Sequence, residues 1–211
     1  MLVAIPTTPL LAGNSPPTPI WNLRLEPGVV PEDTNFHCAA RTYDALPVPQ
    51  TQYFIASNVH PHAPNPLFTG IIIGQLDPDG AGGWTYSSQE LPLPPAAWYV
   101  AAGGAAAPPP AGAVGTSMLF WSVVRRGDSL WAVQGILRNV GGANPMPDPS
   151  GRSIARWYEI VIGDTGGFTL AQWGDIDPEA IYQIADLEAY DPSISVNSVV
   201  KFLLHPRNND I

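Results

Sequence analysis

The chain has 211 residues, of which 45% are hydrophobic and only 13% charged, and it contains 25 prolines and 20 glycines. This apolar content excludes a fully disordered chain, and the lack of a three-residue glycine period excludes collagen. The formal net charge is −9, the wrong sign for binding a phosphate backbone, so we expect no nucleic-acid partner. No run of about 18 apolar residues occurs, so we expect no membrane-spanning helix.

The N-terminal 19 residues are apolar, but they lack a basic start and are interrupted by Pro6 and Pro9. These features favour an extended, proline-rich arm over a cleaved signal peptide. The single thiol, Cys38, can form no internal disulfide bond.

Apolar residues alternate with polar ones through the first hundred positions, which predicts strands. In one of these strands Cys38 and Ala40 are expected to point inward and His37 outward, so Cys38 is interpreted as a small core residue. Residues 69–76 are apolar enough for both faces to be covered, and the Asp-Pro-Asp-Gly sequence that follows predicts a hairpin loop over 77–83. The expected strands are 20–25, 34–43, 52–57, 69–76, 84–88 and 97–101.

Residues 101–115 carry no charge and no periodicity, which indicates an interdomain linker or a long loop. A hairpin is predicted next, with its turn at 125–128. One helix is predicted over 178–189, with Asp177 as N-cap, Pro178 at the first helical position and Glu179 near the positive end of the helix dipole. Its inward side would carry Ile181, Ile184 and Ala185, and the expected strands of this half are 117–124, 129–137, 154–163, 168–173 and 196–204.

Short strands separated by glycine and proline turns predict an all-β fold with one short C-terminal helix. We expect a β-sandwich, either one large or two small, of immunoglobulin-like or jelly-roll-like form. The predicted organisation is an arm over 1–19, a sandwich domain over 20–100, the linker or loop over 101–115 and a second β-rich region over 116–211.

In residues 69–101 an apolar strand is followed by an Asp-Pro-Asp-Gly turn, a Gly-Trp-Thr-Tyr strand, Leu-Pro, and a Trp-Tyr-Val strand. Through this pattern residues 20–100 resemble the immunoglobulin-like modules of bacteria and phages. The resemblance implies a β-sandwich and carries no functional residues across.

Residues 126–130 contain two short motifs that suggest a function. Gly127-Asp128-Ser129-Leu130 looks like the nucleophile block of the GDSL esterases, but the residue three before His205 is Phe202 rather than the aspartate of that family, and no α/β alternation surrounds the serine. Arg126-Gly127-Asp128 is the tripeptide that integrin ligands present on loops. A plain hairpin turn also explains both motifs, and it is the interpretation we favour.

Three groups of residues are candidates for metal binding. His60 and His62 are spaced so that both could face one ion, with His37 or an aspartate as a third ligand. Two aspartate pairs offer oxygen ligands for Ca²⁺, although each also has a structural explanation as a turn former or a helix cap. These pairs are Asp77 with Asp79 and Asp175 with Asp177.

The seven tryptophans could stack on sugars, but they are dispersed one to a strand, so core packing is the favoured interpretation. They are Trp21, Trp84, Trp98, Trp121, Trp131, Trp157 and Trp173.

No complete catalytic, cofactor or metal pattern emerges, so the sequence predicts no enzyme, no catalytic residues, no cofactor and no metal. We expect a structural subunit of a large symmetric assembly in a phage or virus particle: a head-decoration (cement), capsid or tail protein. Its partners would be copies of itself and other structural subunits, contacted through 1–19 and 101–115. The alternative is a carbohydrate-binding or adhesive β-sandwich on a cell surface or fibre tip.

Overall fold

The computed structural model of the protein describes most of the two central β-rich regions and parts of both ends of the chain. The described residues are 2–3, 20–21, 38–42, 50–58, 67–80, 83–100, 120–137, 139–140, 146–147, 153–183, 188–196 and 200–207. The predicted linker over 101–115 and all but two residues of the predicted arm over 1–19 therefore lie outside the described residues.

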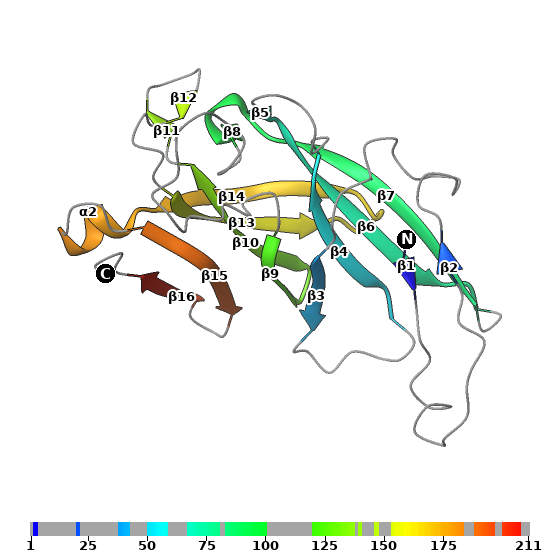
Figure 1. The fold of residues 1–211 in the computed structure, drawn as a ribbon. Coiled ribbons are helices and arrows are strands. Elements are labelled where there is room, and N and C mark those ends of the chain that lie inside the picture. The colour runs from blue at the N-terminus through cyan, green and yellow to red at the C-terminus, as the bar shows by residue number, and fades with distance from the viewer. Residues whose placement is uncertain are drawn as a thin grey trace.

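An eight-stranded sheet forms the body of the protein (Figure 1). Its strands follow the spatial order β14-β13-β10-β9-β3-β4-β6-β7, so four come from each side of residues 101–115. Neighbouring strands are antiparallel except β3 and β9, which run parallel with Ala40 opposite Val123. The bounds are β3 Cys38–Thr42, β4 Gln52–Ser57, β6 Gly70–Pro78, β7 Trp84–Pro92, β9 Phe120–Arg126, β10 Ser129–Leu137, β13 Ser153–Ile162 and β14 Phe168–Ile176.

Four two-stranded antiparallel pairs and two short helices surround this sheet. The helices are the 3₁₀ turn η1, Pro95–Ala97, and α2, Pro178–Tyr182. The pairs are β1 Leu2–Val3 with β2 Ile20–Trp21, β5 Leu67–Phe68 with β8 Tyr99–Val100, β11 Asn139–Val140 with β12 Met146–Pro147, and β15 Glu188–Val196 with β16 Val200–Arg207.

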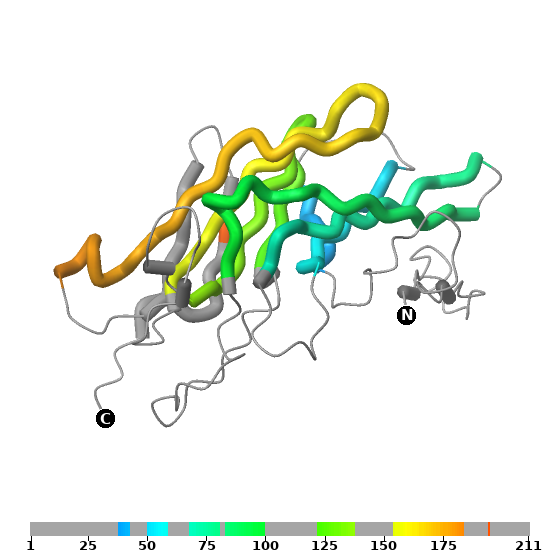
Figure 2. The backbone as a smooth tube through the Cα atoms, turned by 90° about the horizontal axis from the view of Figure 1, so that it is seen from above, coloured from blue at the N-terminus to red at the C-terminus, as the bar shows by residue number. Residues whose placement is uncertain are grey.

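The sheet curls until its edge strands β7 and β14 come into contact (Figure 2). Its inner face holds the main core. Alternation along β10 shows how this arises: Leu130, Ala132 and Ile136 point into the main core, whereas Trp131 and Val133 point outward. The outward residues of β9, β10 and β13 form a second cluster, which Ile194 of β15 covers. Two separate apolar clusters therefore stabilise the two faces of this part of the sheet.

The structure confirms that the protein is β-rich and confirms several predicted strands. β4 and β10 have the predicted bounds, and the predicted hairpin loop joins β6 to β7. Both faces of β6 are buried, as its continuous apolar sequence indicated. In β3, Cys38 and Ala40 contact the main core while Ala39 and Arg41 are exposed, which confirms the predicted alternation.

The predicted helix over 178–189 is wrong in its C-terminal half. Asp177, Pro178 and Glu179 occupy their predicted positions, but the helix ends at Tyr182 and strand β15 begins at Glu188. Gln183 takes a left-handed conformation at φ 56°, which closes the helix, and Ile181 is exposed rather than inward-facing. From Glu188 the chain pairs with β16 instead, so the backbone groups of β15 are hydrogen-bonded in the strand ladder rather than in a helix.

Other boundaries also differ from the predictions; for example, β7 and β14 extend beyond the predicted 84–88 and 168–173. The predicted strand over 196–204 is two strands, because Val196 ends β15 and Val200 begins β16 opposite it. The predicted turn over 125–128 is shorter, since Arg126 pairs with Ser129 and only Gly127 and Asp128 form the turn. Gly127 has φ 55°, as a tight hairpin turn requires. The predicted strand over 97–101 is interrupted at its start, because η1 extends to Ala97.

Gly74 leaves the space that the ring of Tyr86 occupies on the neighbouring strand. A Cβ atom at position 74 would lie close to the Tyr86 hydroxyl and 2.9 Å from its Cζ atom. Tyr86 is buried and also packs edge-on against Phe54, so it has little room to move. We expect Gly74→Ala to lower the free energy of unfolding by about 2 kcal/mol in urea denaturation. Gly167→Ala is the control, because a Cβ there meets nothing within 4 Å, and equal losses in the two variants would contradict this packing.

Candidate functional site

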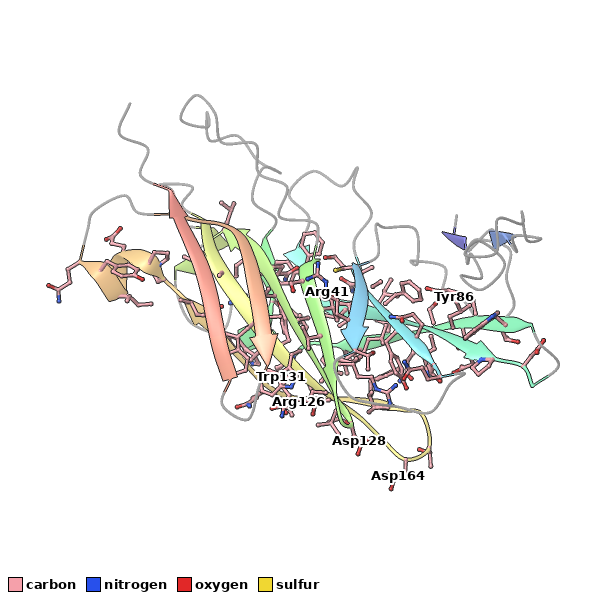
Figure 3. All side chains as sticks on the ribbon, turned by 90° about the horizontal axis from the view of Figure 1, so that it is seen from below. Arg41, Tyr86, Arg126, Asp128, Trp131 and Asp164 are labelled. Atoms are coloured by element: carbon pink, nitrogen blue, oxygen red, sulfur yellow. The ribbon has the colours of Figure 1, made fainter. Side chains whose placement is uncertain are left out.

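The Arg-Gly-Asp and Gly-Asp-Ser-Leu motifs lie at the tip of the β9–β10 hairpin. Gly127 and Asp128 form its turn and are exposed, and the backbone oxygen of Asp128 accepts a 2.7 Å hydrogen bond from the Ile162 amide. Figure 3 shows Asp128 and Asp164 at the tips of neighbouring hairpins. The hairpin-turn interpretation of both motifs is therefore confirmed.

Ser129 begins a strand rather than a helix, so the backbone differs from that of an esterase nucleophile. Its hydroxyl donates a 3.1 Å hydrogen bond to Oε1 of Glu159, whose other oxygen accepts a 2.6 Å bond from Gln172. The Glu159 carboxylate of β13 therefore links Ser129 of β10 to Gln172 of β14 through two hydrogen bonds. The side chain of His205 lies outside the described residues.

The candidate histidine ligands lie outside the described residues, whereas the candidate aspartate ligands lie within them. His37, His60 and His62 lie outside the described residues. Among the residues that are described, no three or more His, Cys, Asp or Glu side chains are grouped so that they could hold a metal ion.

The two aspartates of the first pair accept hydrogen bonds from different parts of the chain. Asp77 accepts a 2.5 Å hydrogen bond from Thr51, and Asp79 Oδ1 accepts a 2.8 Å bond from the Gly83 amide across the loop. The second pair is also divided. Asp175 binds Arg156, whereas Asp177 Oδ1 accepts a 3.1 Å bond from the Glu179 amide as the helix cap. Asp79 and Asp177 thus have the predicted roles of turn former and helix N-cap, whereas Asp77 binds Thr51 and Asp175 binds Arg156 instead.

The tryptophans with described side chains are partly or fully buried. Trp131 and Trp157 stack on each other at 6.1 Å beneath β15, and Trp173 lies 4.7 Å from the Arg156 guanidinium. Trp98 donates a 2.9 Å hydrogen bond to the Leu93 carbonyl. Trp84 is partly buried, and the side chains of Trp21 and Trp121 are not described. Core packing therefore accounts for Trp131, Trp157 and Trp173.

A buried polar network, which the sequence analysis missed, lies inside the curled sheet. Tyr99 donates a 3.2 Å hydrogen bond to Oε1 of Gln134, and Nε2 of Gln134 donates a 2.7 Å bond to the Tyr158 oxygen. The Ser57 hydroxyl lies 3.2 Å from the Tyr99 oxygen. All four side chains are fully buried. They come from β4, β8, β10 and β13, so the network joins both halves of the chain.

Arg156 lies beside this network and is 1% exposed. Its Nε and Nη2 atoms bind the two oxygens of Asp175 at 2.5 and 2.6 Å. Nη1 donates a 2.7 Å hydrogen bond to the Ala97 carbonyl at the end of η1. Two aromatic rings lie within cation–π range, those of Trp173 at 4.7 Å and Tyr99 at 5.9 Å. Arg156 thus fastens the 95–98 segment to strands β13 and β14.

The buried groups have shifted ionisation. Burial raises the pKa of Tyr99 to about 12, although its hydrogen bonds with Ser57 and Gln134 and the charge of Arg156 offset part of the effect. Burial likewise raises the pKa of Tyr158 well above its usual value. For Arg156, burial is the largest single effect and lowers the pKa. The hydrogen bonds with Asp175, together with the electrostatic effects of Tyr158, Asp175 and Tyr99, outweigh it, so the pKa is raised. Both phenols are therefore neutral and Arg156 is charged at neutral pH.

This network can do little chemistry at neutral pH, because its phenols are protonated and its members already bind one another. A satisfied network of this kind rigidifies a core and specifies one arrangement of it. Burial also raises the pKa of the Cys38 thiol, which supports its interpretation as a core residue.

Comparison with known protein families, curated proteins and solved structures finds no match to this chain. Among the described residues, the structure contains no helix with the length and apolar character that a membrane crossing requires.

Proposed function

We propose that the protein is a non-enzymatic structural subunit of a large symmetric assembly, and that the assembly is a phage or virus particle. Within it the chain would serve as a head-decoration (cement), capsid or tail protein, with copies of itself and other structural subunits as partners. The immunoglobulin-like or jelly-roll-like sandwich expected from the sequence is part of this proposal. The observation that carries it is an exposed apolar pair on helix α2.

Helix α2 presents Ile181 and Tyr182 to solvent at one end of the protein (Figure 1). They are 56% and 53% exposed, and they are the large hydrophobic side chains that stand exposed among the described residues. The helix is held in place by the Asp177 cap and closed by Gln183. A fixed isoleucine and tyrosine, side by side, are suited to insertion into a neighbouring subunit, because tyrosine is enriched among the residues that dominate interfaces.

The interior of the sheet also fits a mechanical role. Arg156, Tyr99 and Gln134 join segments from the two halves of the chain through buried hydrogen bonds. A core cross-linked in this way changes shape little when a neighbour docks, so binding costs little ordering entropy.

The mass of the native species tests this proposal, measured by light scattering and negative-stain microscopy. We expect a closed oligomer or decoration of a larger shell or tube. The double change Ile181→Asp with Tyr182→Asp should weaken assembly at least tenfold, since each buried apolar side chain contributes about 1.5–3 kcal/mol. Ala180→Asp is the matched control: Ala180 is exposed on the same helix and should tolerate the charge. Equal assembly of all three proteins would contradict a role for α2.

The second candidate is an adhesive or carbohydrate-binding β protein on a cell surface or fibre tip. The exposed Arg126-Gly127-Asp128 turn favours it, because a hairpin tip presents this tripeptide to a receptor. A stable monomer with no larger native species would favour this alternative over the structural subunit, and a glycan and cell-adhesion screen would then follow.

A further inference from the structure

Five apolar side chains on the outer face of strands β4, β6 and β7 are buried, beside the partly buried Gln52, Ser88 and Glu90 of the same face. Strand register places its side chains together: Phe54 lies opposite Gly74, Ala56 opposite Ile72, and Leu76 opposite Tyr86. Ile72 and Ala56 have no exposed area, and Tyr86, Leu76 and Phe54 are exposed by at most 9%. In Figure 3 Tyr86 marks this face.

Nothing in the two described clusters covers this face. The main core lies on the opposite side of the same strands, where it includes Tyr53, Ile55, Ile71 and Ile73. The second cluster lies over β9, β10 and β13, under β15. Strand β3 lies between β9 and β4, and its Ala39 and Arg41 are exposed. The cover that β15 provides over β9, β10 and β13 therefore does not extend across β3 to β4. The burial therefore requires a second, separate cover from the rest of the chain.

The position of β1 and β2 indicates which segment supplies that cover. These strands pair with each other, Leu2 opposite Trp21 and Val3 opposite Ile20, and so hold both ends of residues 4–19 together. Figures 1 and 3 both show the pair beside the β6–β7 end of the sheet.

The composition of residues 4–19 also fits. The segment contains two Ala, two Leu, one Ile and five Pro and no charged residue, whereas residues 22–37 contain Arg24, Glu26, Glu32 and Asp33. An uncharged, proline-rich chain is already restricted in conformation, so it loses little entropy when it docks on an apolar face.

We infer that residues 4–19 dock on the outer face of β4, β6 and β7 of their own chain in the free subunit. This deepens the proposed function, because it names the surface that the N-terminal arm occupies, and the one on which an arm from a neighbour would exchange in an assembly. The docking itself does not depend on assembly.

Photo-crosslinking of the full chain at a concentration where it is monomeric tests the inference. We expect p-azidophenylalanine introduced at Phe54 to crosslink to residues 4–19, as mapped by mass spectrometry. The same group at Thr85, an exposed position of β7, should give at most one tenth of that crosslink. Crosslinks from position 54 to residues 22–37, 43–49, 59–66 or the equally uncharged 101–119, or crosslinks between isotopically distinct chains, would overturn the inference.

A second measurement guards against disturbance by the crosslinker. The double change Leu10→Asp with Leu11→Asp should raise amide hydrogen exchange in β6 at least tenfold and increase binding of a hydrophobic dye. Thr7→Asp with Thr8→Asp adds the same charge to the same segment and should leave both signals unchanged. If the leucine variant also leaves them unchanged, residues 4–19 do not cover this face. Because both experiments use the free chain, a failure to assemble would leave their outcome intact.

Discussion

Arg156→Met is expected to lower the free energy of unfolding by about 3 kcal/mol. The change leaves the Ala97 carbonyl, which accepts a 2.7 Å hydrogen bond from Arg156, without that donor inside the protein. It also leaves Asp175 without both of its hydrogen bonds from Arg156, although 32% exposure allows that carboxylate some hydration. Methionine nearly preserves the volume of the side chain, so the loss reports the polar contacts rather than a cavity. Urea denaturation followed by circular dichroism measures it.

Arg126→Met is the matched control for this substitution. Arg126 lies at the end of β9, partly exposed, and the described residues offer its side chain no hydrogen bond or ion pair. Its replacement should change the free energy of unfolding by less than about 0.5 kcal/mol. Equal losses in the two variants would show that the contacts of Arg156 do not stabilise the fold.

The 93–99 segment contributes Leu93, Ala97 and Tyr99 to the main core inside the curled sheet. The Leu93 amide donates a 2.8 Å hydrogen bond to the Thr69 carbonyl, and Arg156 donates a 2.7 Å bond to the Ala97 carbonyl. The Tyr99 ring stacks on Phe68 at 4.7 Å. Loss of Arg156 should therefore loosen this segment first, before the strands on which it lies.

Local patterns in the sequence predicted most of the central strands. The apolar runs in 52–57 and 129–137 contain enough information to define β4 and β10, because burial of both faces is a local requirement. The Asp177-Pro178-Glu179 start of α2 was also readable, since capping involves residues two or three positions apart. The far end of α2 was not, because pairing between β15 and β16 decides it.

The buried network was harder to predict, because its members come together only through the order of the strands. Ser57 and Tyr99 are 42 residues apart, and Arg156 reaches Ala97 across 59. One signal was available: Arg156 shares the inward parity of Ile154 and Tyr158 in an apolar strand, where a charge needs a partner. Nothing local indicated that the partner would be Asp175, which the sequence analysis considered only with Asp177, as a calcium-binding pair or, in the favoured interpretation, as part of the helix cap.

The protein is expected to lose stability steeply as the pH rises from about 10 to 12. Tyr99 has a folded-state pKa of about 12 against an ordinary value of 10.0, and the pKa of Tyr158 is raised well above that value too, mainly by burial. A group whose pKa is raised by folding contributes its full stability below the unfolded pKa and loses it through the folded pKa. The change expected from Tyr99 alone is about 3 kcal/mol.

Titration of tyrosinate absorbance alongside circular dichroism checks this expectation. Ionisation of the buried phenols should coincide with loss of the β-sheet signal. A charged Tyr99 cannot donate a hydrogen bond to Gln134, and its burial prevents water from solvating the phenolate. Tyr99→Phe should make the alkaline loss of stability shallower, although it lowers stability at pH 7 by removing the hydrogen bonds to Ser57 and Gln134. If every tyrosine instead titrates near pH 10 while the sheet stays folded, water reaches the network and it cannot act as the rigid interior proposed for an assembly subunit.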